Sequence, residues 1–331
     1  GEHRAVFGRV AVPARADGDR QPATAIRSRS LPRVELLSGR RPLVLLVNPA
    51  ARRAARALAV VRATFAAAGV PYDELHTERP GHAGELARAH AGGAAAIVAL
   101  GGDGTVMEVA DALAYTGCRI GILPGGTGNL VARALGIPMS AAGAARVAVT
   151  GVPRAMDLGR LGCGRRFAFS ASVGVDARMI ATVSGWAKQR FGIAAYVATA
   201  IREAVPCRTF RARVTVDGDV VERDAAEVMI ANIGSVFNDL FLLGPGIGHS
   251  DGHLDLCLYA SRTIAQELDV VWRLWRGRFD APQRVLARPG RVFRVECDPP
   301  QLYQADGEVV GVTPFEATVD AGAATFLVPR A

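Results

Sequence analysis

Short apolar runs alternate with segments of helical period in the first half of the chain. The runs at 43–47, 96–100 and 119–123 are rich in Val, Ile and Leu and too short for helices, which predicts buried strands. A more polar strand is expected at 72–77. Helices are expected at 54–68, 84–90, 106–115 and 129–135. Strands that alternate with helices indicate a parallel sheet with helices on both faces.

From about residue 154 the pattern changes to shorter runs in which apolar and polar positions alternate. These runs lie at 167–173, 210–216, 228–232, 254–258, 291–296 and 317–319. Asp217-Gly218 has the composition of a tight hairpin turn. One long helical stretch is expected at about 178–205. The second half therefore predicts a mostly antiparallel β domain.

The expected fold class is α/β plus β, with a parallel-sheet domain followed by an antiparallel β-sandwich domain. We place the first domain at 42–150 and the second at 151–323, and a C-terminal strand near 324–331 could return to the first domain. Residues 1–41 have no sustained period and are rich in Arg, Pro, Gly and Ser. This composition is typical of a flexible arm.

Basic charge is concentrated in that arm. The chain of 331 residues has a formal net charge of +8, of which the nine arginines and four acids of residues 1–41 give +5. Phe7 is the only aromatic residue of the arm, so nothing indicates a nucleic-acid partner. Lys188 is the only lysine of the chain, so arginines, backbone amides or a metal ion would have to hold any phosphate.

The cysteines are scattered along the chain. Five cysteines without a Cys-x-x-Cys spacing argue against a zinc site and against a disulfide framework. No apolar run approaches the roughly 18 residues that a membrane-spanning helix needs, and no apolar signal-like segment opens the sequence. We therefore expect a protein of the reducing cytoplasm.

Two glycine-rich segments carry the strongest chemical signal. Gly101-Gly102-Asp103-Gly104-Thr105 follows one predicted strand, and Pro124-Gly125-Gly126-Thr127-Gly128-Asn129 follows the next. Glycines let the backbone approach a ligand closely, and the helix start beyond each loop offers unpaired N–H groups to a phosphate. Asp103 adds either a metal ligand or a proton-transfer group.

Neither loop fits the common nucleotide fingerprints. The spacing Gly-x-Gly-x-x-Gly fails because position 107 is Met, and the Walker pattern is absent. Asn48 and Thr77 also follow predicted strands. Because ligands bind outside the carboxyl ends of the strands in such sheets, we expect these two residues and both loops to meet at one edge.

Five motifs together resemble the diacylglycerol kinase catalytic-domain family, which includes bacterial lipid kinases and sphingosine kinases. They are Asn48-Pro49, GGDGTxxE from Gly101 to Glu108, PGGTGN from Pro124 to Asn129, DGHLD from Asp251 to Asp255, and DGE from Asp306 to Glu308. The resemblance runs from about residue 43 to the C-terminus. It implies a nucleotide-binding first domain, a lipid-substrate second domain, and ATP in the cleft between them.

The resemblance also implies a set of nucleotide contacts by position. They are Asn48, Pro49, Ala50, Ala51, Arg52, Thr77, Gly102, Asp103, Gly104, Thr105, Val106, Met107, Glu108, Gly126, Thr127 and Asn129. The Thr105 and Thr127 hydroxyls could add donors to the loop amides. After Asn48-Pro49 the chain departs from the family, because Ala-Ala-Arg-Arg stands where a small or hydroxylic residue, then often glycine, is usual.

Phosphoryl transfer to an alcohol needs an acceptor for the hydroxyl proton and neutralisation of the phosphate charge. The resemblance makes Asp306 the expected general base and Glu308 the second candidate. Asp103 is expected to position Mg²⁺ or the network around it.

The resemblance implies a second, structural Mg²⁺ site in the later motif. The Asp251 carboxylate and the backbone carbonyls of Gly248 and His253 would supply the oxygen ligands that suit this ion. Asp157 resembles a family acid in the charge network between the domains, and Asp176 is a candidate contact of the lipid headgroup. For Asp157 and Asp176 a purely structural role is an equal alternative.

A lipid kinase has to reach its substrate at a membrane surface, and two segments have a fitting pattern. One places Ile264, Leu268, Val271, Trp272, Trp275 and Phe279 at helical spacing, beside Arg273, Arg276 and Arg278. The other holds Trp186, Lys188, Arg190, Phe191 and Tyr196. For each segment, the favoured interpretation is an ordinary helix that packs its apolar face on the β domain.

The sequence thus predicts an ATP- and Mg²⁺-dependent kinase that phosphorylates the hydroxyl of a diacylglycerol-like or sphingoid-type lipid. One alternative is a soluble kinase of NAD or another small alcohol, and a second is a non-catalytic nucleotide-binding regulator. Peripheral contact with the inner face of the membrane and a homodimer are both compatible with the sequence.

Overall fold

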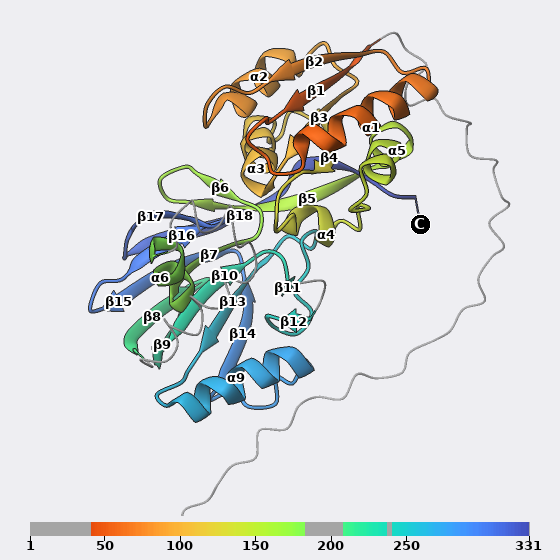
Figure 1. Ribbon diagram of the computed structural model, residues 1–331. Helices are drawn as coiled ribbons and strands as arrows, with labels where there is room; N and C mark the ends of the chain where they lie inside the picture. The colour runs from red at the N-terminus through yellow and green to blue at the C-terminus, as the bar shows by residue number, and fades with distance from the viewer. Residues whose placement is uncertain (1–40, 183–207, 237–239, 331) are drawn as a thin grey trace, which may run out of the picture. The chain divides into compact units, whose positions relative to one another are not determined.

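The computed structural model describes residues 41–182, 208–236 and 240–330 (Figure 1). The predicted arm before Arg41 and the segment from Trp186 to Tyr196 lie outside the described residues. So does most of the helix expected at 178–205, whose described beginning is α6 (Val175–Thr182).

Apolar runs of the first half build a parallel sheet. Its strands are β1 (Leu43–Val47), β2 (Tyr72–His76), β3 (Ala96–Gly101) and β4 (Arg119–Pro124), in the order β2-β1-β3-β4. Every residue of β1 and β3 is buried, because helices cover both faces of a parallel sheet. The outer strand β2 is more polar and partly exposed.

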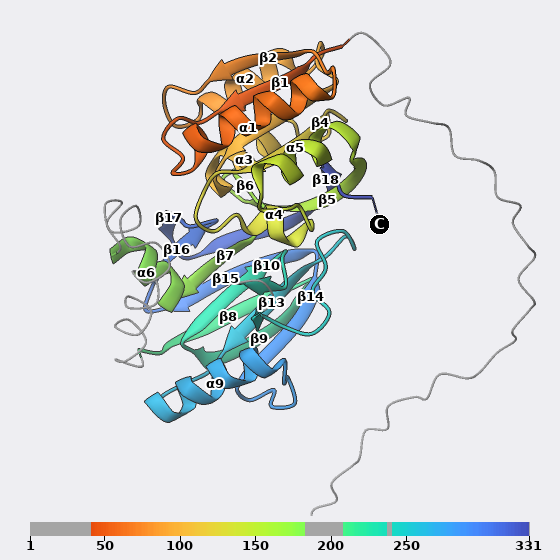
Figure 2. The same cartoon turned by 45° about the vertical axis from the view of Figure 1, so that its right-hand side comes forward.

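Helices pack in pairs on this sheet. α1 (Ala54–Ala67) lies beside α5 (Ala141–Thr150), and α2 (His82–His90) lies beside α3 (Asp103–Ala112). Figure 2 shows α1 and α5 in front of the sheet and α2 behind it. The short α4 (Leu130–Ala134) follows the second glycine loop. Helices and strands share one apolar core, in which Leu45, Phe65 and Ile97 are fully buried.

The second half folds into two facing antiparallel layers. Among the described residues, one layer has the strand order β14-β13-β10-β7-β16-β17, and the other contains β15, β8 and β9. The bounds are β7 (Ser170–Gly174), β8 (Phe210–Val216), β9 (Asp219–Ala225), β10 (Glu227–Ala231), β13 (Leu254–Tyr259), β14 (Val285–Gly290), β15 (Val292–Asp298), β16 (Leu302–Ala305) and β17 (Glu308–Val312). Val214, Leu256 and Phe293 lie in the core between the layers.

Alternate residues of the first of these layers face a third, smaller core. This core contains Met229 and Tyr259 together with Val270 of α9 (Ile264–Arg276), and Leu274 of the same helix packs against it. α9 also packs beside β12 (Phe241–Leu242), which pairs with β11 (Ser235–Val236).

One long strand, β18 (Phe315–Val328), connects the two halves. It pairs antiparallel with β15 through residues 315–318 and parallel with β4 through Thr325 and Phe326. β5 (Val152–Leu161) runs antiparallel along most of its length. An irregularity between Asp320 and Ala324 separates the two parts of the strand.

The structure confirms the predicted parallel-sheet and antiparallel-sandwich architecture, and two details differ. α3 begins at Asp103 rather than near residue 106, because an acid in the first turn stabilises the positive end of a helix. The run expected at 167–173 is split into β6 (Arg166–Phe167) and β7. The hairpin at Asp217-Gly218 is confirmed, and both residues have the positive φ that this turn requires, 51° and 96°.

The described residues contain no helix whose length and apolar content would allow it to cross a bilayer. Four cysteines lie in the described ranges, and all four are free thiols: Cys118, Cys163, Cys257 and Cys297.

Candidate active site

The register of the parallel sheet brings four predicted segments to one edge. Val47 pairs with His76 and with Leu100, and Gly101 pairs with Pro124. The residues that follow these positions are therefore neighbours at the carboxyl edge of the sheet. They are Asn48, Thr77, Gly102 and Gly125.

Asn48 joins the end of β1 to the first turn of α3. Its Nδ2 donates to Thr105 Oγ1 at 2.8 Å, and its Oδ1 accepts from the backbone N–H of Ala50 at 3.0 Å. Its own N–H donates to the carbonyl of Leu100 at 2.9 Å. Asn48 thus orders the loop that would approach a nucleotide.

The two glycine loops are in direct backbone contact. The N–H of Gly125 donates to the carbonyl of Gly101 at 2.7 Å. A Cβ on Gly126 would lie 2.7 Å from the Cα of Gly102, and a Cβ on Gly101 would lie 2.5 Å from the Cβ of Thr105. Gly125 and Gly126 are therefore needed where the two loops pack on each other, and Gly101 is needed because Thr105 of its own segment lies against it. A Cβ on Gly104 would meet no atom within 4 Å, so open space for a ligand lies at Gly104.

Asp103 links the first loop to the second. Its half-buried carboxylate accepts from the N–H of Val131 at 3.3 Å, and the N–H groups of Asn129 and Leu130 also stabilise its charge. Burial nevertheless raises the pKa of Asp103 above its usual range, and these backbone donors only partly oppose the rise.

Asp306 approaches from the second half of the chain. It lies in the turn between β16 and β17, where Asp306 has φ 47° and Gly307 has φ 85°. Its Oδ2 accepts from the N–H of Ala168 at 2.7 Å, and its Oδ1 accepts from Phe169 and Ser170 at 2.9 and 3.1 Å. Because these N–H groups bind Asp306, they are not available for pairing between strands, which explains the break between β6 and β7.

The carboxylates of Asp103 and Asp306 lie near enough to influence each other. Burial raises the pKa of Asp306 to about 6, the three backbone N–H donors oppose the rise, and the negative charge of Asp103 adds to it. Two motif acids from opposite halves of the chain thus influence each other electrostatically. A cluster of this kind is typical of catalytic centres.

Glu308 has a different environment. Its side chain is two-thirds exposed, at 66%, and its Oε2 pairs with Arg165 Nη2 at 2.8 Å. Of the two acids in the Asp-Gly-Glu motif, only Asp306 turns inward to the backbone amides of 168–170.

Several of the predicted nucleotide contacts have structural partners. Glu108 accepts from the N–H groups of Gly81 and Ala83 at 2.8 and 3.1 Å, so it caps α2. The Asn129 side chain bonds the N–H and the carbonyl of Gly126. Val106 and Met107 are buried in the core.

The remaining predicted nucleotide contacts lie at the same edge of the sheet, and most of them are exposed. Pro49, Ala50, Arg52 and Thr127 are exposed, and Thr77 is buried. Ala51 packs close to Gly125, because a Cβ on Gly125 would lie 3.4 Å from the Cβ of Ala51. The departure from the family after Asn48-Pro49 therefore brings the Ala51 side chain against the second loop, and the backbone N–H of Arg53 donates to the carbonyl of Gly125 at 3.1 Å.

Asp157 holds three segments together. Its Oδ1 accepts from the N–H of Gly322 and its Oδ2 from the N–H of Gly252, both at 2.7 Å, and its own N–H donates to the carbonyl of His249 at 2.8 Å. The side chain is only 3% exposed. Asp157 thus fixes the loop that precedes Asp251.

The Asp251 loop is closed by its own carboxylate. Asp251 Oδ1 accepts from the N–H of His253 at 3.0 Å, and a Cβ on Gly248 would lie 2.9 Å from Asp251 Oδ2. Burial raises the pKa of the nearby Asp255 to about 6, and the charge of Asp251 adds to the rise. No cluster of three or more His, Cys, Asp or Glu side chains suited to a metal occurs in the described ranges, so protein side chains alone do not enclose an ion here.

Asp176 belongs to a polar cluster that the sequence did not reveal. Its Oδ2 accepts from Ser172 Oγ at 3.0 Å and from Gln304 Nε2 at 2.9 Å, and its N–H donates to Glu227 Oε2 at 3.0 Å. Gln304 Oε1 accepts from the N–H of Gly307 at 2.8 Å. Gln304 therefore connects Asp176 to the turn that carries Asp306. The only sequence signal for this role of Gln304 is its position two residues before Asp306.

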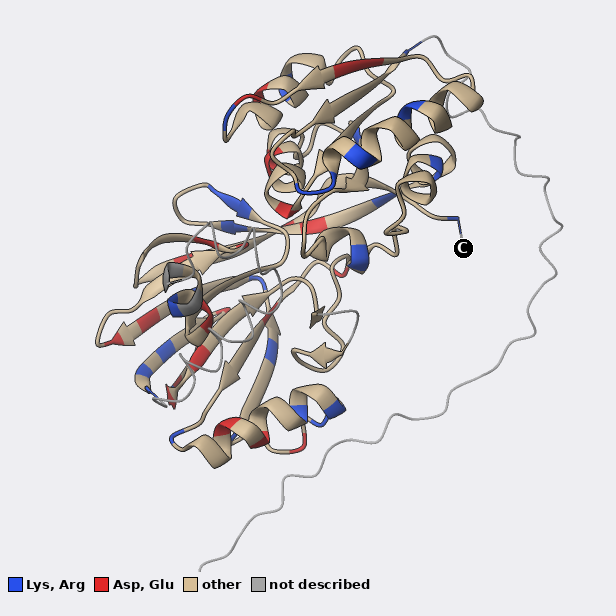
Figure 3. Cartoon of the chain, in the orientation of Figure 1, with Lys and Arg blue, Asp and Glu red and all other residues tan. Residues whose placement is uncertain are grey.

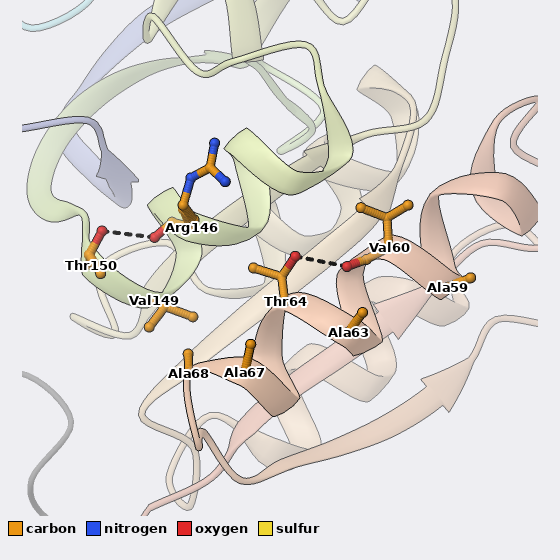
Figure 4. A pocket seen from close by; sticks show the side chains of 9 residues that line it. All are labelled: Ala59, Val60, Ala63, Thr64, Ala67, Ala68, Arg146, Val149 and Thr150. Atoms are coloured by element: carbon orange, nitrogen blue, oxygen red, sulfur yellow. Dashed lines mark hydrogen bonds between the residues drawn. The ribbon is translucent and has the colours of Figure 1, made fainter.

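A groove between α1 and α5 lies apart from this site. It has a volume of about 750 Å³ and is lined by alanines with Val60, Thr64, Arg146, Val149 and Thr150 (Figure 4). Both threonine hydroxyls donate to carbonyls of their own helices. Because α1 begins at the carboxyl edge of the sheet, its second half, which lines the groove, points away from that edge.

Two family models match consecutive parts of the chain. The diacylglycerol kinase catalytic domain matches residues 42–161, and the YegS C-terminal NAD kinase beta sandwich-like domain matches residues 169–328. Together they take in both halves of the fold and all five motifs.

Individual relatives agree with these matches. An uncharacterised protein of Synechocystis sp. is 34% identical over 225 residues, which are 66% of this chain and 52% of that protein. The chain thus spans about half the length of this relative. A diacylglycerol kinase of Mycobacterium tuberculosis is 29% identical over 74% of this chain and 80% of its own length.

A solved structure shares the fold. The crystal structure of a provisionally assigned diacylglycerol kinase from Bacillus anthracis has a TM-score of 0.75 and is 25% identical. The match covers 87% of this chain and 95% of that chain.

Proposed function

Because the chain belongs to the diacylglycerol kinase catalytic-domain family, we propose that it transfers the γ-phosphoryl group of ATP to the hydroxyl of a diacylglycerol-like or sphingoid-type lipid. The observation that carries the proposal is the setting of Asp306, whose carboxylate accepts three backbone N–H groups in the turn of the Asp-Gly-Glu motif and is influenced by the charge of Asp103. The named M. tuberculosis relative supports a diacylglycerol-like acceptor.

Asp306 is the proposed acceptor of the hydroxyl proton. A carboxylate offers about four lone-pair positions, and three of those of Asp306 are occupied by backbone N–H groups. Oδ2 accepts only one of the three, so it keeps a lone pair for the proton. With a pKa of about 6, the group is largely ionised near neutral pH and can act as a base.

The reaction forms a bond between the lipid oxygen and the γ-phosphorus and breaks the bond from that phosphorus to the bridging oxygen. The proton of the lipid hydroxyl passes to Asp306. The loop amides near Gly104, where the backbone borders open space, would bind phosphate oxygens. Positioning and charge neutralisation are the main contributions that a protein makes to such a transfer.

The residues present fit Mg²⁺, the proposed cofactor. This ion is usually held by one or two carboxylates together with substrate phosphates and waters, and Asp103 offers one carboxylate beside the loops. When bound, Mg²⁺ would neutralise charge on the phosphate oxygens. Asp251, with the carbonyls of Gly248 and His253, would hold a second ion, whose charge would relieve the repulsion between Asp251 and Asp255.

A pair of variants tests the proton acceptor. We expect Asp306→Asn to lower kcat by about 10²-fold or more, because loss of a general base typically costs 10²–10⁴-fold. Glu308→Gln is the matched control and should keep kcat within about threefold, because surface ion pairs contribute little. Kinase assays with labelled ATP on a lipid panel measure both variants, and calorimetry checks that ATP still binds. Equal losses in the two variants would contradict the assignment.

The same assay separates the alternative enzymes. NAD and small alcohols are included as acceptors, and product identification follows. If the protein phosphorylates NAD and no lipid, the assignment as a lipid kinase would be wrong and a soluble NAD kinase would take its place. ATP binding without turnover on any acceptor would indicate a regulator.

A further inference from the structure

α9 exposes an apolar stripe that takes no part in packing the helix on its domain. The stripe consists of Ile264, Leu268, Val271, Trp272 and Trp275, whose exposed fractions lie between 41% and 64%. At 3.6 residues per turn these positions span only about 100° of the helix circumference. Val270, Leu274 and Phe279 make the contact with the sheet instead, so the favoured sequence interpretation of a single packed apolar face is wrong for this helix.

The stripe continues onto the neighbouring hairpin. Leu240 and Leu242 are also exposed, and a Cβ on Gly277 at the end of α9 would lie 3.1 Å from Leu242 Cδ1. Monomeric proteins rarely leave a continuous apolar surface of this kind without a partner.

Basic charge accompanies one end of the stripe. The guanidinium of Arg276 lies 5.6 Å from the ring centre of Trp275, and that of Arg278 lies 5.6 Å from the ring centre of Trp272. Figure 3 shows the acids of α9 toward its beginning and the arginines toward its end.

The acids nearby neutralise the arginines at this end only in part. Asp269 pairs with Arg273 at 2.9 Å, and Asp280 is shared between Arg273 and Arg278. No acidic side chain of the described ranges pairs with Arg276. The end of the stripe that carries both tryptophans is therefore positively charged.

We propose that the α9 stripe docks this protein on an anionic phospholipid surface, with α9 lying in the plane of the interface. Tryptophan prefers the boundary between water and hydrocarbon, and Leu268 would enter the acyl region. Arg276 and Arg278 would bind the headgroup phosphates. The choice of a lipid surface rests on the proposed function, because the substrate of that reaction lies in a membrane.

Flotation of the full-length protein with vesicles tests this surface. The vesicles are phosphatidylcholine alone, or phosphatidylcholine that contains phosphatidylglycerol. We expect Trp272→Ser with Trp275→Ser to weaken binding by at least about tenfold, because buried apolar area contributes much of the interfacial affinity. Arg276→Gln with Arg278→Gln should remove most of the preference for phosphatidylglycerol. Val220→Ser with Val292→Ser, at exposed strand positions, is the matched control and should leave binding unchanged.

Two results would overturn the proposal. One is equal vesicle binding by the wild type and the tryptophan variant, which would assign membrane contact to another segment. The other is a dimer in sedimentation analysis that the tryptophan substitutions dissociate while vesicle binding persists, which would make the stripe a self-association surface.

The kinase reaction is measured separately. The tryptophan variant should keep its turnover of a short-chain, water-dispersed diacylglycerol and lose turnover of a long-chain lipid in vesicles. A wild type that binds vesicles through the stripe but phosphorylates no lipid would refute the proposed function and leave the docking surface standing.

Discussion

At the scale of residues, the site is built from carboxylates held by backbone amides. Asp103, Asp157 and Asp306 each accept N–H groups from segments far away in the chain. The sequence predicted Asp103 and Asp306 because they lie in motifs, and it predicted Asp157 from its resemblance to a family acid. It could not predict their partners, because an amide donor at Ala168 or Gly322 requires no particular side chain and leaves no signal.

The coupling between Asp103 and Asp306 predicts a pH dependence. The pKa of Asp306 is raised to about 6 by burial, with a contribution from Asp103, so kcat/KM should rise as the pH increases through about 6 and Asp306 loses its proton. Asp103→Asn removes a neighbouring negative charge and should move the pKa of Asp306 downward. Carboxyl NMR titration measures this shift without requiring activity. Asp219→Asn, whose carboxylate pairs with Arg288, is the control, and an unmoved Asp306 pKa in Asp103→Asn would refute the coupling.

At the scale of elements, the glycines of the two loops have two roles, packing of the loops on each other and leaving open space for a ligand. The sequence did not show which glycine has which role. The strands and helices around them were predictable from apolar period, and their order placed the loops at one edge. The close packing of the two loops was not predictable, because it depends on the spacing of β3 and β4. Gly125 and Gly126 serve this packing, Gly101 leaves room for Thr105, and Gly104 alone among the glycines of the first loop borders open space.

This division predicts opposite effects of two alanine substitutions. Gly126→Ala should destabilise the fold by about 1–3 kcal/mol, because its Cβ would press on the Gly102 backbone. Gly104→Ala should raise stability by up to about 1 kcal/mol, because alanine favours a helix more than glycine does, and should weaken ATP binding. Urea unfolding and calorimetry measure the two effects. A Gly104→Ala protein with unchanged ATP affinity would show that phosphate does not approach there.

At the scale of the whole described unit, an ion cluster around the buried Asp320 joins the two halves. Arg166 on β6 donates to Asp320 on β18 at 2.7 Å and to Asp111 on α3 at 2.9 Å, and Arg160 also pairs with Asp320. The carboxylate of Asp320 is almost fully buried. The motifs gave no indication of this cluster, because its members come from four elements, α3, β5, β6 and β18, and none of them belongs to a motif.

Removal of Arg166, the central arginine of the cluster, should therefore destabilise the fold. Arg166→Met is expected to lower the free energy of unfolding by about 1–3 kcal/mol, since it leaves the buried Asp320 with one partner fewer. Arg165→Met removes the exposed pair with Glu308 next to it and should change stability by less than about 0.5 kcal/mol. Urea titrations of both variants provide the comparison, and similar losses would show that burial of Asp320 does not set the cost.

β18 has a consequence for how the protein is made. Phe326, Leu327 and Val328 are buried in the core of the first half, and Phe326 completes the sheet beside β4. A ribosome therefore releases nearly all of the first half long before it synthesises the strand that closes that sheet. Until then the edge of β4 has unpaired backbone groups, which favour association with other chains. The newly made first half thus depends on the second half, or on a chaperone, for protection during synthesis.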